Sequence, residues 1–285
     1  MKKIAVLGLL VLAVMASMLV GCTDEELTQE EIEQFVADVM TANAEIVTCK
    51  LNIHTLTTFN ETGGPKPGGG TITGDGTGAI DSANRKLQML IDMTINVPDK
   101  AEQNMPVEYY LVGGWMHIKM SIPEKGEQWI KMKMPDELWD EQSQLDQQIE
   151  ILETAKEVNF LGVEEVSGTA CYIVEIVPGT EVLNKLLSQV KMPEIEGVDP
   201  LELNLSELLK EMSIKEWIAK DSYLFMKSEN RIVMEILPGD VGATEEDFEK
   251  ITMNTVSEIE FYDYNEAVSI ELPAEALEAS EMPGS

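Results

Sequence analysis

Histidine and cysteine, the residue types that most often carry out chemistry in proteins, are scarce in this chain of 285 residues. The two histidines, His54 and His117, lie far apart in strand-like runs, and the three cysteines are also widely separated. A zinc site takes about four such ligands at short spacings, so these residues predict no metal centre. There is no glycine-rich phosphate loop before a helix, and the many acidic residues single out no catalytic pair. We therefore expect a protein that is not an enzyme and that uses no metal and no cofactor.

The first cysteine, Cys22, closes an N-terminal segment with the layout of a secretory signal. Lys2-Lys3 precedes an apolar run over residues 4–20, which is too short and too closely followed by acidic residues to span a membrane. The run ends Leu19-Val20-Gly21-Cys22, which resembles the lipobox of bacterial lipoproteins. An ordinary signal peptide followed by a chance cysteine is the alternative.

The lipobox resemblance implies a lipid anchor. It implies that residues 1–21 are removed and that Cys22 carries diacylglycerol, often with a further fatty acid such as palmitate. Two or three acyl chains hold a protein firmly at a membrane, whereas one chain binds only marginally. We expect residues 22–28 to be the lipidated tether, in the cell envelope outside the cytoplasm (the outer face of the cell membrane or the periplasm).

The chain is strongly acidic, with a formal net charge of −32. Removal of the signal segment takes away two lysines and leaves −34. Such a surface repels nucleic acid and anionic headgroups, so we expect no nucleic-acid partner and membrane contact through the anchor alone. A hydrophobic content of 44% is enough for a folded core, and residues 29–285 contain no long linker. We expect them to form a single domain.

The other two cysteines, Cys49 and Cys171, both lie in strand-like runs. Export would permit a disulfide between them, provided that their Cα atoms lie within about 7 Å. Two buried free thiols are the alternative, and the sequence does not decide between them.

The periodicity of apolar residues predicts one helix followed by many strands. Thr28 and Glu31 form a capping box, and apolar residues at helical spacing predict an amphipathic helix over residues 29–44. Strict alternation over residues 87–97 is the clearest strand. Further strands are expected at 46–58, 71–82, 107–112, 115–121, 128–134, 157–164, 169–177, 214–220, 222–228, 231–237, 251–262 and 268–272, with helical insertions from about 135 and over about 180–212. Short turns between strands predict antiparallel pairing, and a sheet of this size should curl strongly.

A curled sheet with amphipathic helices needs something to fill its concave side: the helices, a ligand or both. Methionine suits surfaces that adapt to apolar partners, and many of the 17 methionines lie on predicted strands, although ordinary core filling explains them too. The residues expected to line an apolar cavity are Leu87, Met89, Ile91, Met93, Met116, Ile118 and Met120 on strands, with Leu183, Leu186 and Leu187 on a helical lid.

Three stretches resemble one known superfamily. Residues 216–227 (Glu-Trp-Ile-Ala-Lys-Asp-Ser-Tyr-Leu-Phe-Met-Lys), 168–175 (Gly-Thr-Ala-Cys-Tyr-Ile-Val-Glu) and 258–276, which contain Phe261-Tyr262-Asp263-Tyr264-Asn265, are similar to strand pairs of the LppX/LprG-type lipoproteins and the related LolA/LolB lipoprotein carriers. The resemblance implies an α+β fold, in which a half-open β-barrel of about 11 antiparallel strands is wrapped around or covered by amphipathic helices.

For function, this resemblance implies a carrier that binds acyl chains of a lipid or an acylated lipoprotein in an apolar cavity. A non-catalytic envelope sensor that binds a protein partner is the alternative on the same fold. A surface lipoprotein with a filled core and a structural role is a third.

Overall fold

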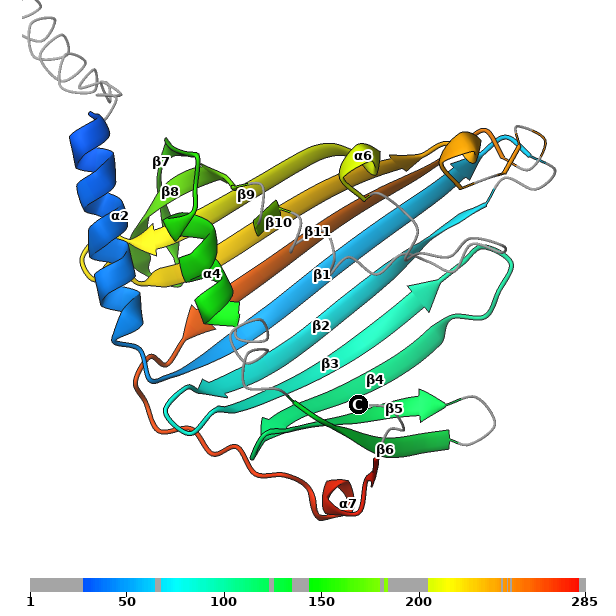
Figure 1. Ribbon diagram of the computed structural model, residues 1–285, viewed down its shortest axis with the longest axis horizontal. Helices are drawn as coiled ribbons and strands as arrows, with labels where there is room; N and C mark the ends of the chain where they lie inside the picture. Colours follow the sequence, from blue (N-terminus) through cyan, green and yellow to red (C-terminus); the bar gives the residue numbers. More distant parts are fainter. Residues whose placement is uncertain are drawn as a thin grey trace, which may run out of the picture.

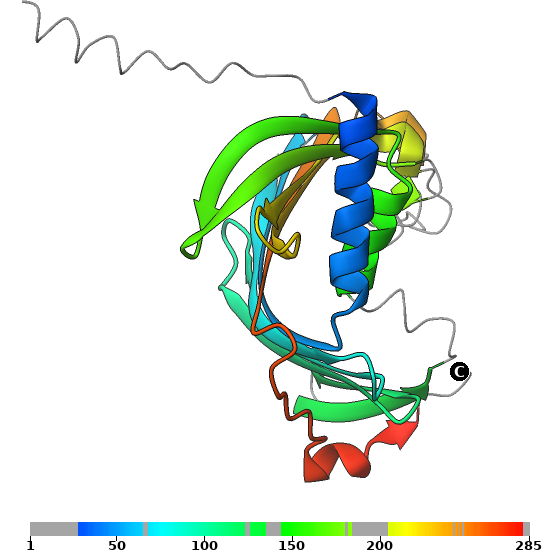
Figure 2. The same cartoon turned by 90° about the vertical axis from the view of Figure 1, so that its left-hand side faces the viewer.

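The computed structural model describes residues 28–64, 68–122, 126–134, 144–179, 182–183, 205–241, 243–244, 246 and 248–281. Its strands form one curved sheet of 12 strands, with helices α2 (Gln29–Ala44) and α4 (Gln144–Glu153) on the concave side (Figures 1 and 2). The predicted signal segment, Cys22 and all but the last residue of the predicted tether lie outside the described residues.

The sheet consists of two antiparallel meanders joined edge to edge. The first comprises β1 (Thr48–Thr62), β2 (Gly69–Asp81), β3 (Lys86–Asn96), β4 (Gln103–Val112), β5 (Trp115–Ile122) and β6 (Gly126–Lys133). The second comprises β7 (Glu157–Val166), β8 (Thr169–Val177), β9 (Leu209–Ala219), β10 (Phe225–Ile236) and β11 (Lys250–Tyr262). Strand β1 pairs with β11 from Lys50 to Thr62, and this pairing unites the two meanders.

The sheet is open, with β7 at one edge and the short β12 (Ser280–Glu281) at the other. The predicted large curved sheet with helices on one face is therefore confirmed, but no barrel closes. The sheet is also mixed rather than wholly antiparallel, because β12 runs parallel to β6. This last strand follows helix α7 (Ala274–Leu277), which a segment along the rim of the sheet connects to β11 (Figure 1).

Helix α2 begins where the sequence predicts. Thr28 Oγ1 accepts a hydrogen bond from the amide of Glu31 (3.3 Å), and the Glu31 carboxylate accepts one from the Thr28 amide (2.8 Å). These bonds satisfy two amides that the first turn of a helix leaves free. The helix buries Phe35 and Val39 against the sheet side of the molecule.

Because side chains alternate along a strand, the sheet has two faces. We call the face beneath α2 and α4 the helix-covered face and the opposite one the outer face. The main apolar cluster joins Val39 of α2 and Leu152 of α4 to strand residues such as Leu51, Leu87 and Phe261, all nearly inaccessible to solvent. A second cluster on the helix-covered face surrounds Met234 and Met253, and a small third one on the outer face surrounds Trp217.

Strand β2 explains part of the curvature. Its helix-covered face carries glycine at positions 70, 74, 76 and 78. A Cβ atom at Gly76 would lie 2.6 Å from the Leu90 carbonyl oxygen and 2.9 Å from Ile91 Cγ1. The missing side chain thus lets side chains of β1 and β3 approach one another over β2, which folds the sheet toward the helices.

Three predictions of elements are wrong. The strands expected at 222–228 and 231–237 form one continuous strand, β10. Residues 268–272, expected as a strand, belong to the connection between β11 and α7 and are not part of the sheet. The helix predicted over about 180–212 is wrong at its C-terminal end, because α6 (Leu205–Leu208) gives way to β9 at Leu209. There, Met212 and Ile214 alternate with polar residues and pair with β10, so sheet pairing overrides the helical spacing of the leucines.

Candidate functional site

The strand residues predicted to line a cavity lie together on the helix-covered face. Cross-strand pairs in β2 to β5 put them in register with Gly74, Tyr109 and Leu111 on one side of the sheet. Leu87 and Met89 are buried in the main cluster, Ile91 and Met116 pack against it, and Met93 and Ile118 are half-buried. Leu183 packs against the second cluster. The side chain of Met120, and Leu186 and Leu187 entirely, lie outside what the structure describes.

Toward the β6 edge, the helix-covered face carries apolar side chains that are only half-buried. They come from β3 to β6 and are in register with one another: Met93, Ile95, Met105, Val107, Ile118, Ile130 and Met132. We call this set the half-buried apolar surface. Helix α2 does not reach it, because its aromatic contacts are with Phe160, Tyr172 and Tyr223 at the other end of the sheet. The surface can therefore make further apolar contacts.

A band of polar side chains crosses the helix-covered face between its two apolar clusters. Asn230 of β10 lies beside Ser257 of β11, which lies beside Thr55 of β1; Thr255 and Thr57 form the next row. The hydroxyls pair across the strands, Thr55 with Ser257 at 3.1 Å and Thr57 with Thr255 at 3.0 Å. All five residues, which we call the polar belt, are half-buried.

A completely buried carboxyl group lies at the covered end of the polar belt. Glu216 of β9 is opposite Ser228 of β10, and both side chains have 0% exposure. Ser228 Oγ is 2.9 Å from Glu216 Oε1 and 3.2 Å from Oε1 of Gln148, a buried residue of α4. Within the described chain, Glu216 Oε2 and Asn230 Oδ1 have no hydrogen-bond partner. Sheet and helix α4 are thus joined through one serine hydroxyl.

Glu216 holds its proton more tightly than an ordinary glutamate. Burial raises the pKa of its carboxyl group well above 4.5, and the hydrogen bond from Ser228 opposes this only in part. In the protonated state Glu216 can donate to Ser228, and the serine can then donate to Gln148. A hydroxyl carries a single proton, so this chain satisfies both short contacts. In that state Glu216 is a neutral polar group on an apolar face.

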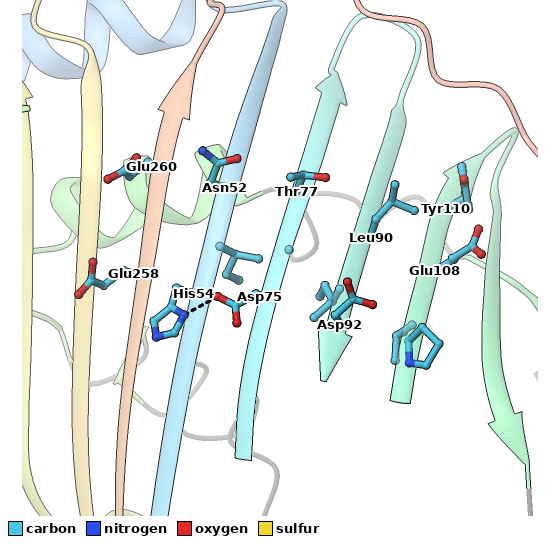
Figure 3. Close-up of a pocket in the computed structure, with 15 residues that line it drawn as sticks. Asn52, His54, Asp75, Thr77, Leu90, Asp92, Glu108, Tyr110, Glu258 and Glu260 are labelled. Atoms are coloured by element: carbon cyan, nitrogen blue, oxygen red, sulfur yellow. Dashed lines mark hydrogen bonds and ion pairs between the residues drawn. The ribbon is translucent and has the colours of Figure 1, made fainter. Parts of the chain in front are cut away.

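The outer face bears a shallow groove of ≈ 860 Å³ across β11, β1, β2, β3 and β4 (Figure 3). Glu258 and Glu260 lie at one end of the groove, and Asp92 and Glu108 lie toward the other. The exposed side chain of Leu90 lies between these two acidic ends, beside Asp92 and Glu108. In the middle, His54 Nδ1 lies 2.6 Å from Asp75 Oδ1. The lining residues include no lysine or arginine, and two of the five carboxylates pair with lysines beside the groove, Glu258 with Lys227 and Glu108 with Lys119. The groove therefore keeps a net negative charge.

The two histidines lie far apart on the outer face, His54 on β1 and His117 on β5. The His54 side chain is half-exposed, and its Nδ1 contacts Asp75. His117 is buried beneath α7, where its Nδ1 lies 3.1 Å from the Ala276 carbonyl oxygen, and burial lowers its pKa. No group of three or more His, Cys, Asp or Glu side chains in the described ranges could hold a metal ion.

Cys49 and Cys171 are both buried free thiols. Cys49 belongs to the main cluster on the helix-covered face, whereas Cys171 packs beside Trp217 on the outer face. Strands β11, β10 and β9 separate them, so their backbones lie on the order of 19 Å apart, too far for a disulfide. Burial raises the pKa of both thiols, that of Cys49 to about 12. The disulfide that the sequence left open is not formed.

Neither the polar belt nor the buried carboxyl group was predicted from the sequence. A signal for the belt is nevertheless present in the sequence. Among the inward residues of β1, Thr55 and Thr57 interrupt an apolar series that resumes at Phe59. Among those of β11, Thr255 and Ser257 interrupt an apolar series that resumes at Ile259. Only the register of the two strands brings these interruptions to the same depth.

A family model matches residues 31–281, so the chain belongs to DUF6612, a family of unknown function. No curated protein matches. Among solved structures, the chain is similar to the lipoprotein LppX of Mycobacterium tuberculosis (13% identity, 86% of this chain and 100% of that one, TM-score 0.42). It is also similar to LprF of Mycobacterium bovis (13%, 86% and 98%, 0.45) and to a LolA superfamily protein of Nitrosomonas europaea (10%, 85% and 94%, 0.22). None of the described helices is long and apolar enough to cross a membrane.

Proposed function

We propose that this protein is a lipid-anchored envelope protein that binds acyl chains of a lipid or an acylated lipoprotein on its helix-covered face and passes them between membranes. The observation that carries the proposal is the half-buried apolar surface of β3 to β6, which α2 leaves uncovered. Isolated half-exposed apolar residues are common on proteins, but seven in register on the inner side of a curved sheet form a continuous surface.

The energetics of such a surface suit a carrier. Burial of each methylene contributes roughly 0.8 kcal/mol, so an acyl chain laid along the surface would bind through many small, non-directional contacts. Three of the seven residues are methionines, Met93, Met105 and Met132, whose flexible side chains adapt to chains of differing length. Binding without fixed polar partners also lets the chain leave again when a membrane competes for it.

The anchor forms the second part of the proposal. A lipid on Cys22 would hold the domain at a membrane, and the strongly acidic surface would keep it from adhering to anionic headgroups. We further propose that the protein catalyses no reaction, because its only histidines lie on the outer face in structural contacts.

The test is native mass spectrometry of a soluble form that starts after Cys22, purified without detergent. All described elements begin at or after Thr28, so this form retains the described fold. We expect a near-stoichiometric adduct that organic extraction removes and identifies as lipid. A mass that remains that of the bare protein after incubation with lipid vesicles would rule out the carrier function.

A second candidate function is a binding module for a protein partner, favoured by the acidic groove on the outer face. Its occupant would carry positive charge, since five carboxylates line the groove and lysines pair with only two of them, Glu258 and Glu108. The two functions use opposite faces of the sheet, so substitutions on one face can test one function without affecting the other. Asp92→Asn with Glu260→Gln would weaken a partner in the groove and leave the lipid adduct unchanged.

A further inference from the structure

We propose that the polar belt is a headgroup site for a lipid whose polar part is uncharged and rich in hydroxyls, such as the glycerol of a diacylglycerol or a single sugar. The inference rests on the proposed function and names its ligand class. A headgroup site would explain why polar residues lie on this face between two apolar clusters, which core packing does not.

The position of the belt fits an amphiphile. The belt covers three adjacent strands, β10, β11 and β1, and two residues along each of β11 and β1, an area of about 10 Å by 7 Å. The main cluster borders it on one side and the cluster around Met234 and Met253 on the other. Thr55 pairs with Gly74 of β2, which has no side chain, and Gly74 pairs in turn with Met93 of the half-buried apolar surface. A headgroup on the belt would therefore send its acyl chains along that surface.

The chemistry of the belt fits hydroxyl groups. A threonine or serine hydroxyl donates one hydrogen bond and accepts two, so the pairs Thr55–Ser257 and Thr57–Thr255 retain capacity for a ligand. Asn230 Oδ1 is buried and lacks a partner in the described chain, and at the covered end Glu216 Oε2 lacks one too. Buried polar atoms are nearly always hydrogen-bonded in native proteins, so the orphan Asn230 Oδ1 marks where a donor from a ligand would bind. The third orphan of the described chain, Asn254 Oδ1, lies on the outer face, away from the belt.

The charge of the site excludes anionic headgroups. The belt and its neighbours in register, such as Ile53 and Ile214, include no lysine or arginine that could pair with a phosphate. On the helix-covered face, Glu216 is the ionisable side chain nearest in register to Asn230, and it can add only negative charge to a protein that already carries −32. A phosphate on the belt would lose its water without a cation to replace it.

The test uses the complete lipidated protein in phosphatidylcholine vesicles with photoactivatable lipids. Three probes share the same acyl chains, with a diazirine at the headgroup end: diacylglycerol, galactosyldiacylglycerol and phosphatidylglycerol. Peptide mapping then counts labels on β1, β10 and β11. We expect the uncharged probes to label these strands about tenfold more than phosphatidylglycerol, and the stronger of the two distinguishes a glycerol from a sugar site.

A double variant, Thr55→Val with Ser257→Ala, removes both partners of one hydroxyl pair and so leaves no group unsatisfied. It should lower the preference for uncharged probes about fivefold and leave the labelling by phosphatidylglycerol unchanged. The matched control is Thr58→Val, which makes the same change on the outer face of β1. Asn230→Leu should also lose the preference while folding at least as stably, because it removes an orphan oxygen.

The outcomes separate the two proposals. Equal labelling by all three probes, or an unchanged preference in the double variant, would overturn the headgroup site and leave acyl-chain binding standing. Labelling by none of the probes above that of an unrelated lipoprotein in the same vesicles would overturn the proposed function and the headgroup site together.

Discussion

The two faces of the sheet are built from the same strands yet differ in almost every property. In β1, the inward residues are buried, as Leu51 is, or half-buried, whereas the outward residues Asn52, His54 and Leu56 are exposed. The helix-covered face is mostly apolar, and its buried or half-buried polar groups include the polar belt, Glu216 and Ser228. The outer face carries ion pairs, among them Lys227 with Glu258 at 2.7 Å, and the acidic groove. The comparison shows that one face can hold an apolar ligand while the other provides solubility and a surface for a partner.

The largest expected effect comes from matched truncations on the two faces of β1. Leu51 has 0% exposure and Leu56 37%, so Leu51→Ala should lower the free energy of unfolding by about 2–5 kcal/mol and Leu56→Ala by less than about 1 kcal/mol. Denaturant unfolding of the two variants measures the difference. Equal losses would mean that the outer face is also covered, which would remove the basis of the comparison.

The next effect concerns Glu216 and pH. Because its folded-state pKa is raised above the unfolded value of about 4.5, the folded protein binds this proton more tightly, and its contribution to stability is complete below pH 4.5. That contribution is lost as the pH rises from 4.5 through the raised pKa. Glu216→Gln mimics the protonated group, so we expect it to gain about 1–3 kcal/mol relative to the wild type at pH 8 and nothing at pH 4.5.

Thermal unfolding of both proteins across this pH range measures the effect. Glu258→Gln is the matched control on the outer face, where the carboxylate pairs with Lys227 and should lose rather than gain stability at pH 8. A Glu216→Gln variant that is less stable than the wild type at pH 8 would show that the buried group is ionised and held by a partner.

A smaller effect is expected for ion pairs of the outer face. Lys227 lies 2.7 Å from Glu258 and 5.0 Å from the centre of the Trp217 ring. Since the pair is partly exposed, Lys227→Met should cost about 0.5–1 kcal/mol at low salt and less in 1 M NaCl. Lys215→Met changes the net charge equally but breaks a longer contact of 3.8 Å to Glu229, so it should cost less. A cost that does not change with salt would contradict an electrostatic origin.

Much of the sheet could be predicted because it depends on local rules. The capping box at Thr28 and the alternation from Leu87 to Val97 each contain their own structural signal. Both elements form as predicted, except that β3 begins and ends one residue earlier than the alternation indicates. The face assigned to Leu87, Met89, Ile91 and Met93 follows from the same alternation. An alternating pattern does not say which face the helices cover, but an apolar row has to be the inward one.

The parts that could not be predicted depend on contacts between distant strands. Thr55 and Ser257 are 202 residues apart in sequence, and only the β1–β11 register makes them neighbours. Glu216 reads as an ordinary polar residue of an exposed strand face until Gln148 of α4 is placed above Ser228. The parallel strand β12 has just two residues, too few for any periodicity, and forms because the chain end returns to β6.

The smallest expected effect is none, and it tests the separation of the two faces directly. Cys49 lies on the helix-covered face and Cys171 on the outer face, both buried and both with raised pKa values. We expect neither thiol to react with iodoacetamide in the folded protein at pH 7.5 and both to react in urea, and a reducing agent should leave the thermal midpoint unchanged. Cys171→Ser provides a control, because it removes one reactive thiol in urea. A reducing agent that lowers the midpoint would show a bond between these cysteines, which requires the two strands to be neighbours and would contradict the register of the second meander.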